Sequence, residues 1–242
     1  MLTHFKNVLI SLFLLSLTAC NSVTQQTNSE VTIIGEMRKV MWKGELGGNI
    51  LLDTIADKSG LYGLGPVEYL SGEILIIDGK SYKSTVVSDT SMLVEETYNI
   101  KAPFFGYANV GKWHEHALPD SIQTIQQLEL YLDDITKSSK RPFMFKLSGE
   151  VEHAIFHIVN LPKGSKVSSP EEAHQGQVNY TLQDDKVDIV GFFSTEHQRI
   201  FTHHDTFLHM HLITKDRKKM GHLDELLLKS GGVKLYLPEQ SK

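Results

Sequence analysis

The sequence predicts an α+β fold of two lobes, each built on a mixed or antiparallel β-sheet with few helices. Short runs of β-branched and aromatic residues, bounded by Gly, Pro, Asp or Ser, recur from Val31 onward, as in a sheet protein with tight connections. Only two segments show helical periodicity. The length of 242 residues, 40% of them hydrophobic and 22% charged, suits a single compact domain with its own core.

The N-terminus has the features of a secretory signal peptide, predicted to cover residues 1–19. Lys6 supplies a positive charge, and an apolar run extends from Val8 to Leu17, too short to span a bilayer but typical of a signal. The single cysteine, Cys20, follows in the sequence Leu-Thr-Ala-Cys. This resembles the bacterial lipobox, whose cysteine is diacylated and becomes the first residue after cleavage. A plain cleaved signal with an incidental cysteine is the alternative.

These features predict an extracytoplasmic, lipid-anchored protein, because two or more acyl chains hold a protein stably at a membrane. Asn21 is not the aspartate associated with retention in the inner membrane, which favours the periplasmic face of the outer membrane. Residues 20–30 are polar and are predicted to form a flexible tether between the lipid and the folded domain.

The folded part is predicted to consist of strands with two helices. The helical segments begin near Gly48, extending to Ala56, and at Ser121, where apolar residues recur at positions 122, 125, 128 and 132, one face of a helix. The polar stretch 162–175 divides an N-terminal lobe, 31–161, from a C-terminal lobe, 162–242, within one overall domain. The strand signals are VTIIGEMRKVMW (31–42), GEILIIDGKSY (72–82), STVVSD (84–89), RPFMFKLSG (141–149), HAIFHIVNL (153–161), KVDIVGFFS (186–194), FLHMHLIT (207–214) and GGVKLYLP (231–238).

The composition excludes several partners and cofactors. Removal of residues 1–19 takes away one basic side chain, Lys6, and leaves 23 basic and 29 acidic ones, a net charge of −6 that offers no attraction to nucleic-acid phosphates. No glycine-rich phosphate loop follows a predicted strand, so a nucleotide cofactor is not expected. The expected partners are a small-molecule substrate and the membrane. The oligomeric state is left open, with a homodimer among the states allowed.

Three of the 12 histidines have the spacing of a metal site. His209 and His211 are separated by one residue on a predicted strand, so both rings project from the same face. His222 follows the polar turn 215–221, which would return the chain antiparallel beside them. Three imidazoles with an open fourth position are typical of a catalytic zinc site. Alternate histidines also occur on solvated strand faces, so the pair alone does not decide the matter.

The remaining histidines give weaker signals. His203 and His204 are adjacent, so at most one could face the metal, and a solvated loop is the simpler interpretation. His114 and His116 lie in the segment Trp-His-Glu-His before Leu118 and Pro119, which is predicted as a loop, with a role in a substrate cavity as the alternative.

Four segments of the sequence resemble blocks of a known family, the acetolactate decarboxylases. GLGPVEYLSGEILIIDG (63–79) resembles its G-x-G-T-F-x-x-L-D-G-E-L-x-x-x-D-G block, and FMFKLSG (143–149) resembles F-Y-A-I-R-I-D-G. IVGF (189–192) matches its I-V-G-F, and HMHLITKDRKKMGH (209–222) is similar to H-L-H-F-I-x-x-x-R-x-x-G-G-H with both histidine intervals preserved. The four blocks occur in the family's order and span most of the mature chain.

The resemblance implies a two-lobed enzyme that decarboxylates 2-acetolactate, a 2-hydroxy-2-methyl-3-oxo acid, to acetoin and carbon dioxide. It implies a Zn²⁺ ion held by His209, His211 and His222. The vicinal hydroxyl and ketone of the substrate suit chelation by such an ion, which acts as a Lewis acid. Glu73 matches the carboxylate that would handle the proton. An exposed strand glutamate is the alternative for Glu73.

The chain departs from the family pattern in two places. His157 stands where the family has an arginine expected to bind the substrate carboxylate, and imidazole lacks the two-pronged donor geometry of guanidinium. A strand histidine with no role is the alternative. No match to the family's C-terminal segment with a further catalytic glutamate follows Leu237, where Glu239 is the nearest carboxylate. Two further hypotheses therefore stand beside the decarboxylase: a zinc enzyme for another small hydroxy-keto acid, and a lipoprotein that binds a metabolite without catalysis.

Overall fold

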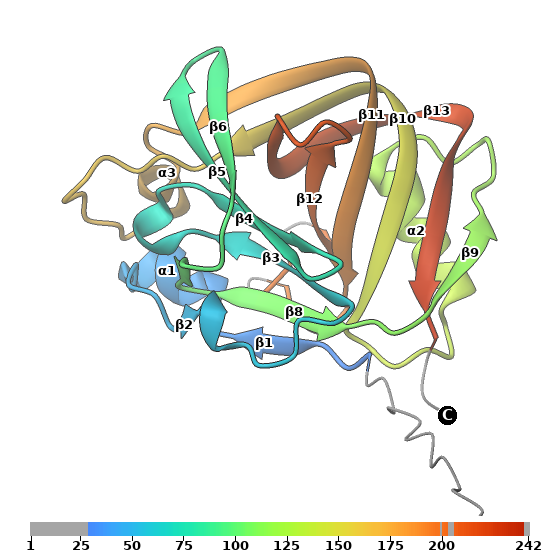
Figure 1. The fold of residues 1–242 in the computed structure, drawn as a ribbon, viewed down its shortest axis with the longest axis horizontal. Helices are drawn as coiled ribbons and strands as arrows, with labels where there is room; N and C mark the ends of the chain where they lie inside the picture. The colour runs from blue at the N-terminus through green and yellow to red at the C-terminus, as the bar shows by residue number, and fades with distance from the viewer. Residues whose placement is uncertain (1–28, 199, 203–205, 240–242) are drawn as a thin grey trace, which may run out of the picture.

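The computed structural model describes residues 29–198, 200–202 and 206–239 of the chain. The described strands form two main antiparallel sheets and a two-stranded ribbon (Figure 1). The first sheet has the order β1-β8-β3-β4-β5-β6 and the second β10-β11-β12-β13-β9. The strands of the first sheet are β1 (Thr32–Ile34), β3 (Leu61–Pro66), β4 (Glu73–Ile77), β5 (Lys80–Ser88), β6 (Ser91–Glu96) and β8 (Phe105–Asn109). Those of the second are β9 (Trp113–Ala117), β10 (Phe143–Ile158), β11 (Val178–Phe193), β12 (Leu208–Thr214) and β13 (Met220–Pro238), and the ribbon pairs β2 (Ile50–Leu51) with β7 (Lys101–Ala102).

Four strands of the second sheet close into a ring. β10 pairs with β11 on one side and with β13 on the other, while β12 pairs with both β11 and β13. β10 and β11 are 16 residues long and β13 is 19. Their length carries them across the first sheet, so that the two sheets share one core.

Side-chain alternation along the strands separates two apolar clusters. On β12 and β13, Ile213 and Met220 belong to the core between the two sheets, whereas Leu212 and Leu223 belong to the core on the far side of the second sheet, under α2. On β4, Leu75 faces the core between the sheets, and the neighbouring isoleucines face the opposite side. A polar residue at an alternate position of any of these strands therefore points into the space between the sheets.

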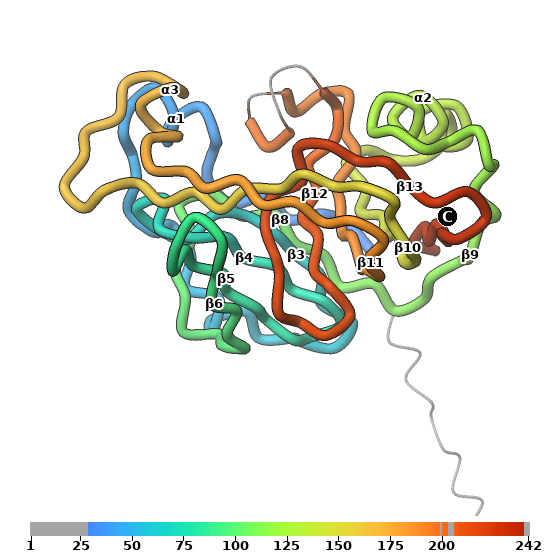
Figure 2. Tube along the Cα trace, turned by 90° about the horizontal axis from the view of Figure 1, so that it is seen from above, coloured from blue at the N-terminus to red at the C-terminus, as the bar shows by residue number. Residues whose placement is uncertain are grey.

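The three α-helices in the described part of the chain lie at two ends of the molecule. α1 (Met37–Lys43) and α3 (Pro170–Ala173) lie side by side at one end, and α2 (Ile125–Ile135) lies at the other (Figures 1 and 2). α2 confirms the helix predicted after Ser121, but it begins later because Thr124 forms a capping box with Gln127. The α+β class with antiparallel sheets is confirmed.

The structure corrects three local predictions. The predicted strand 31–42 is a strand only at β1; after it, Met37, Val40 and Met41 are buried at helical spacing in α1, which ends at Gly44 in the left-handed conformation. The segment 48–56 is not a helix. It pairs through β2 and makes one 3₁₀ turn, η1 (Leu52–Thr54), because its apolar residues pack on the first sheet.

The third correction concerns the segment predicted as a loop around His114 and His116. It is strand β9, which pairs with the end of β13 from Trp113↔Pro238 to Ala117↔Lys234. The sheets divide the chain between β8 and β9, near residue 110, whereas the predicted lobes divide it at residue 162. β10, placed by sequence in the N-terminal lobe, pairs within the second sheet.

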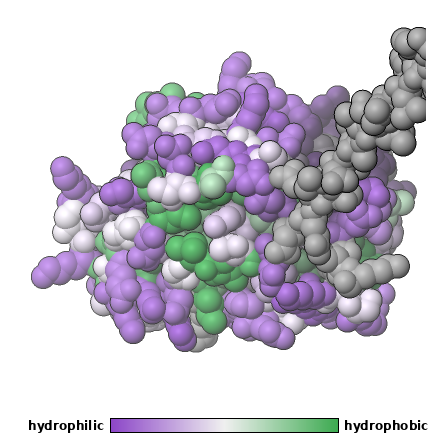
Figure 3. All heavy atoms as spheres, turned by 60° about the horizontal axis from the view of Figure 1, so that its bottom comes forward, coloured by the Kyte–Doolittle hydropathy of each residue, from purple (hydrophilic) through white to green (hydrophobic). Residues whose placement is uncertain are grey.

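Several predicted features lie outside the described residues: the signal segment 1–19, Cys20, the tether up to residue 28, and His203 and His204. Among the helices that are described, none is both long and apolar enough to cross a membrane. The surface at the bottom of the Figure 1 view is largely hydrophilic, with hydrophobic side chains gathered near its centre (Figure 3).

Candidate metal centre

Three histidines from β12 and β13 meet in the space between the two sheets. His209 and His211 project from the same face of β12, and His222 lies directly opposite His211 in the β12–β13 pair. One nitrogen of each ring lies within 4.8 Å of the others, and the ring centroids are 5.0 to 5.4 Å apart. The predicted strand, turn and return strand are confirmed, and they bring the three rings together.

Main-chain carbonyl groups fix the orientation of two of these rings. The Nδ1 of His209 lies 2.9 Å from the Phe201 oxygen, and the Nδ1 of His211 lies 2.9 Å from the Ile74 oxygen on β4. Because a carbonyl can only accept, each Nδ1 carries the proton. In each ring Nε2 is then the nitrogen that could ligate a metal ion, as in metal-binding histidines with an outer hydrogen bond on Nδ1.

The Nε2 atom of His211 shows that the cluster fits a metal ion. The His211 side chain is 0% exposed, and within the described residues its Nε2 has no hydrogen-bond partner. A buried nitrogen without a partner is costly, and a bound cation would satisfy it. Burial also lowers the pKa of His211 well below its ordinary value, and the adjacent His209 adds to this effect. The ring is thus neutral, as ligation requires.

Glu73 is an acidic group that lies beside the cluster. It is the first residue of β4 and faces the same side as Leu75, toward the second sheet. Its side chain is 3% exposed, and its Oε2 lies 3.6 Å from the His211 Nε2. Its Oε1 accepts from the Val159 N–H at 3.3 Å. The interpretation of Glu73 as an exposed strand residue is therefore wrong.

The environment of Glu73 favours its protonated form. Burial raises the pKa of this carboxyl well above its ordinary value; the Val159 N–H opposes the effect and the negative charge of Asp224 adds to it. Glu73 therefore keeps its proton to a higher pH than an exposed glutamate does. A carboxyl beside a metal cluster that can both hold and release a proton suits acid–base work.

His157 lies beside the cluster on the neighbouring strand. It pairs directly with His222 across β10 and β13, and the two ring centroids are 4.7 Å apart. Its Nδ1 lies 2.8 Å from both carboxylate oxygens of Asp224. Nδ1 therefore donates to this carboxylate, which fixes the ring plane and leaves the Nε2 edge as the one that can meet a ligand.

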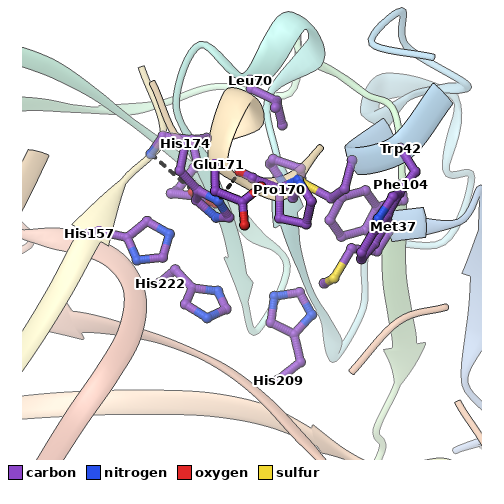
Figure 4. A pocket seen from close by; sticks show the side chains of 14 residues that line it. Met37, Trp42, Leu70, Phe104, His157, Pro170, Glu171, His174, His209 and His222 are labelled. Atoms are coloured by element: carbon purple, nitrogen blue, oxygen red, sulfur yellow. Dashed lines mark hydrogen bonds between the residues drawn. The ribbon is translucent and has the colours of Figure 1, made fainter. Parts of the chain in front are cut away.

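A cavity of about 250 Å³ connects these groups to the surface. Figure 4 shows His157, His222 and His209 following one another along one side of it, with Pro170 and Glu171 of α3 across from them. Apolar side chains of α1 complete the wall, and Trp42, 42% exposed, lies at the outer end of this helix. The lining residues are Met37, Met41, Trp42, Pro66, Leu70, Glu73, Phe104, His157, Val159, Pro170, Glu171, His174, His209 and His222.

The structure thus brings the predicted residues Glu73, His157, His209, His211 and His222 to one place. Sequence reasoning missed Asp224 and His174, because each reaches His157 across the fold and neither lies in a recognisable motif. His174 follows α3, and its ring lies edge-on to His157 with centroids 5.9 Å apart. An Asp two residues after a predicted ligand histidine, on the same strand face, was the available signal for Asp224.

Three other candidate residues lie elsewhere. His114 and His116 line a separate cavity beside Ile135 and Phe143, so they take no part in the metal cluster. Glu239 forms an ion pair with Lys112 at 3.1 Å and lies 3.4 Å from the His114 Nε2. It does not line the cavity at the metal cluster.

Comparison with known proteins agrees with this geometry. The sequence profile described as alpha-acetolactate decarboxylase matches residues 34–241. The chain belongs to the alpha-acetolactate decarboxylase family. The resemblance seen in the four sequence blocks is therefore confirmed over nearly the whole folded part of the chain, and the family is one of carbon–carbon lyases.

Individual relatives in the alpha-acetolactate decarboxylase family are distant. The enzyme of that name from Lactococcus lactis subsp. cremoris (strain MG1363) is 26% identical over 189 residues, covering 76% of this chain and 74% of the relative. The acetolactate decarboxylase structure from Bacillus subtilis strain 168 superposes with a TM-score of 0.69 at 19% identity, covering 87% of this chain and 86% of that one. A structure from Bacillus subtilis subspecies spizizenii gives 0.71 at 20% identity, with the same coverage. At such identities the structures show a shared fold.

Proposed function

We propose that the protein is a zinc-dependent lyase that converts 2-acetolactate to acetoin and carbon dioxide. Membership of the alpha-acetolactate decarboxylase family supports the reaction class. The observation that carries the proposal is the buried Nε2 of His211, which lacks a partner in the described structure and faces both the other two ring nitrogens and Glu73.

His209, His211 and His222 would hold the zinc ion. When bound there, zinc would supply Lewis acidity toward the hydroxyl and ketone oxygens of the substrate. The open side of the cluster faces the cavity that His157 and Glu73 also line. The substrate would therefore meet the metal, the carboxyl and the imidazole together.

Glu73 supplies the proton that the reaction consumes. Loss of carbon dioxide breaks the bond between the carboxylate carbon and C2 and leaves an electron pair at C2, which must take up one proton to give acetoin. The Glu73 carboxyl is buried at the inner end of the cavity and can hold a proton there. Its hydrogen bond from Val159 keeps one oxygen fixed, and the other oxygen lies beside the metal cluster, 3.6 Å from the His211 Nε2, where a substrate on the metal would meet it.

His157 orients the substrate by binding the substrate's carboxylate group. Asp224 holds its Nδ1 edge, and the opposite edge faces the cavity. With both ring nitrogens protonated, the imidazole would offer one donor, at Nε2, to the carboxylate, where guanidinium would offer two. The anchoring contact is accordingly weaker, and this favours a second candidate on the same site: a zinc lyase for a different small hydroxy-keto acid.

The reaction is tested with purified protein, zinc and 2-acetolactate, scored by acetoin and carbon dioxide released in equal amounts. We expect turnover in the zinc-loaded protein and none after chelation. Bound zinc without acetoin release would reject 2-acetolactate as the substrate. A panel of 2-hydroxy-3-oxo acids with other side chains would then separate the second candidate from a protein that only binds.

We also propose that Cys20 carries a lipid and anchors the protein on the periplasmic side of the outer membrane. The support is the short apolar segment followed by Leu-Thr-Ala-Cys and Asn21. Labelling of cells with a radioactive fatty acid should mark the wild-type protein and leave a Cys20→Ser variant unlabelled. Recovery of the unmodified wild-type protein from the aqueous periplasmic fraction would contradict the anchor.

A further inference from the structure

A second cavity, of about 750 Å³, lies at the edge of the space between the two sheets. Its wall comes from both sheets: Tyr62 on β3 and Tyr107 on β8 belong to the first, and Trp113 on β9 and Lys146 on β10 belong to the second. It shares no lining residue with the cavity at the metal cluster. What it could bind is therefore a separate question from the decarboxylase reaction.

Lys146 is a half-buried cation in this wall. Its Nζ lies 4.7 Å from the ring centroid of Tyr236, 5.2 Å from that of Trp113 and 5.7 Å from that of Tyr62. The described part of the chain gives it no hydrogen bond and no ion pair, whereas the nearby Lys215 contacts Asp188 at 2.6 Å. Burial lowers the pKa of Lys146, although the charges of Asp188 and Asp78 oppose this. Aromatic faces only partly replace the oxygen acceptors of a desolvated ammonium.

Trp113 places a second donor at the same point. Its Nε1 is buried, and among the described residues it has no hydrogen-bond acceptor. Burial raises the pKa of Tyr62 and the nearby indole partly offsets this rise, but the contact of the indole with the Tyr62 hydroxyl does not meet the criteria of a hydrogen bond. A buried N–H without an acceptor is uncommon in folded proteins. Since Lys146 Nζ lies over this indole ring, one carboxylate group could accept from both.

Carboxylates line the other part of the cavity and narrow the choice of ligand. Asp57 and Asp78 are among them, and Glu30, which also lines the cavity, forms an ion pair with Lys140 at 2.6 Å. These acidic groups would repel a polyanion such as a phosphate ester, but they can accept a hydrogen bond from a hydroxyl group.

We propose that this cavity binds a small hydroxycarboxylate. Its carboxylate accepts hydrogen bonds from Lys146 Nζ and Trp113 Nε1, and its hydroxyl donates to Asp57 or Asp78. The site is distinct from the metal cluster and does not depend on the proposed lyase activity.

The two tryptophans of the chain, Trp42 and Trp113, make a direct test possible. Each gives one indole N–H signal in a ¹H–¹⁵N spectrum, and Trp42 lines the cavity at the metal cluster. Titration of the full-length protein with lactate should shift the Trp113 signal downfield, as a new hydrogen bond does, with saturation. Acetate should bind more weakly than lactate because it lacks the hydroxyl, and inorganic phosphate more weakly still.

Variants test whether lactate binding depends on Lys146. Lys146→Met keeps the aliphatic stem and should weaken lactate binding by about 10-fold or more, the range for a charged hydrogen bond. Lys218→Met, which removes an exposed lysine, is the matched control and should bind as wild type. Calorimetry on Trp113→Phe, which keeps an aromatic ring but loses the N–H, should show weaker binding than wild type. An unmoved Trp113 signal, an equal response in Lys146→Met, or a shift confined to Trp42 would overturn the proposal.

Discussion

The two walls of the cavity at the metal cluster are built differently. On the metal wall, the His209 and His211 rings are oriented by main-chain oxygens of Phe201 and Ile74. On the substrate wall, His157 is oriented by a side chain, Asp224, which is 33% exposed, and short helices supply the remaining surface. A main-chain partner can be displaced only by moving the backbone, whereas a side-chain partner changes with one substitution.

This difference suggests a division of labour within the proposed enzyme. The metal wall, whose histidine spacing matches the family pattern, would carry the chemistry. The substrate wall, where His157 stands at the position expected to carry the family's arginine, would set which acid is accepted. Substitutions on the two walls should therefore have different signatures, in metal content on one side and in KM on the other.

The largest effect is expected from His222→Ala. This residue is only half-buried, so its loss removes a ligand with little damage to the core. Zinc affinity should fall by more than about 100-fold, beyond what loss of an orienting partner costs, and acetoin release should disappear. Equilibrium dialysis with metal analysis gives the affinity. His116→Ala, on β9 outside this cavity, is the control and should retain zinc; an unchanged affinity in His222→Ala would contradict the ligand assignment.

Glu73→Gln should separate the proton step from metal binding. Glutamine keeps an oxygen to accept from Val159 but cannot hold the transferable proton. Turnover should fall by about 10² to 10⁴, the usual range for a general acid or base, while one zinc per chain remains. Stopped assays of acetoin alongside metal analysis check both quantities. If zinc is lost in proportion to activity, Glu73 acts on the metal instead.

A smaller effect should come from Gly106→Ala on β8. A Cβ at this glycine would lie 1.9 Å from the ring of Phe201, whose carbonyl orients His209. Displacement of this carbonyl should weaken zinc binding by about 10- to 100-fold, the usual effect of losing a residue that orients a ligand. Gly47→Ala, where nothing lies within 4 Å, is the matched control. Equal zinc affinities in the two variants would show that the carbonyl does not set the ligand geometry.

The smallest effect is expected on the substrate wall. Asp224→Ala should leave zinc content unchanged and raise KM by up to about 10-fold, since one charged hydrogen bond that positions the anchoring residue is lost. Steady-state kinetics measure this split. In a His157→Ala background the same substitution should add nothing, because Asp224 acts through His157. An equal loss in both backgrounds would mean that Asp224 has a different role.

Strand periodicity was enough to predict from sequence that the three histidines lie together. Alternation places His209 and His211 on one face of a strand, and a polar turn returns His222 beside them, so local geometry decides the cluster. Glu73 needed the family resemblance as well, because its burial depends on the second sheet covering β4. Contacts such as that between His157 and Asp224 depend on the β10–β13 register, with its bulges, and no local pattern encodes that register.

Two segments were predicted wrongly, and for related reasons. Residues 37–43 directly follow a β-branched strand. Their apolar residues keep helical spacing over a short segment only, so the sequence was predicted as a strand throughout. β9 carries mostly polar side chains and is a strand because β13 offers it an edge to pair with. In both cases tertiary contacts outweigh a weak local preference.

We propose that zinc on His209, His211 and His222 makes this protein an acetolactate decarboxylase. This proposal is tested most directly by adding zinc stepwise to metal-free protein and measuring acetoin formed from 2-acetolactate. We expect a rate that rises in proportion to bound zinc and levels off at one ion per chain. An equal rate in the metal-free protein, or full zinc occupancy without acetoin, would contradict it.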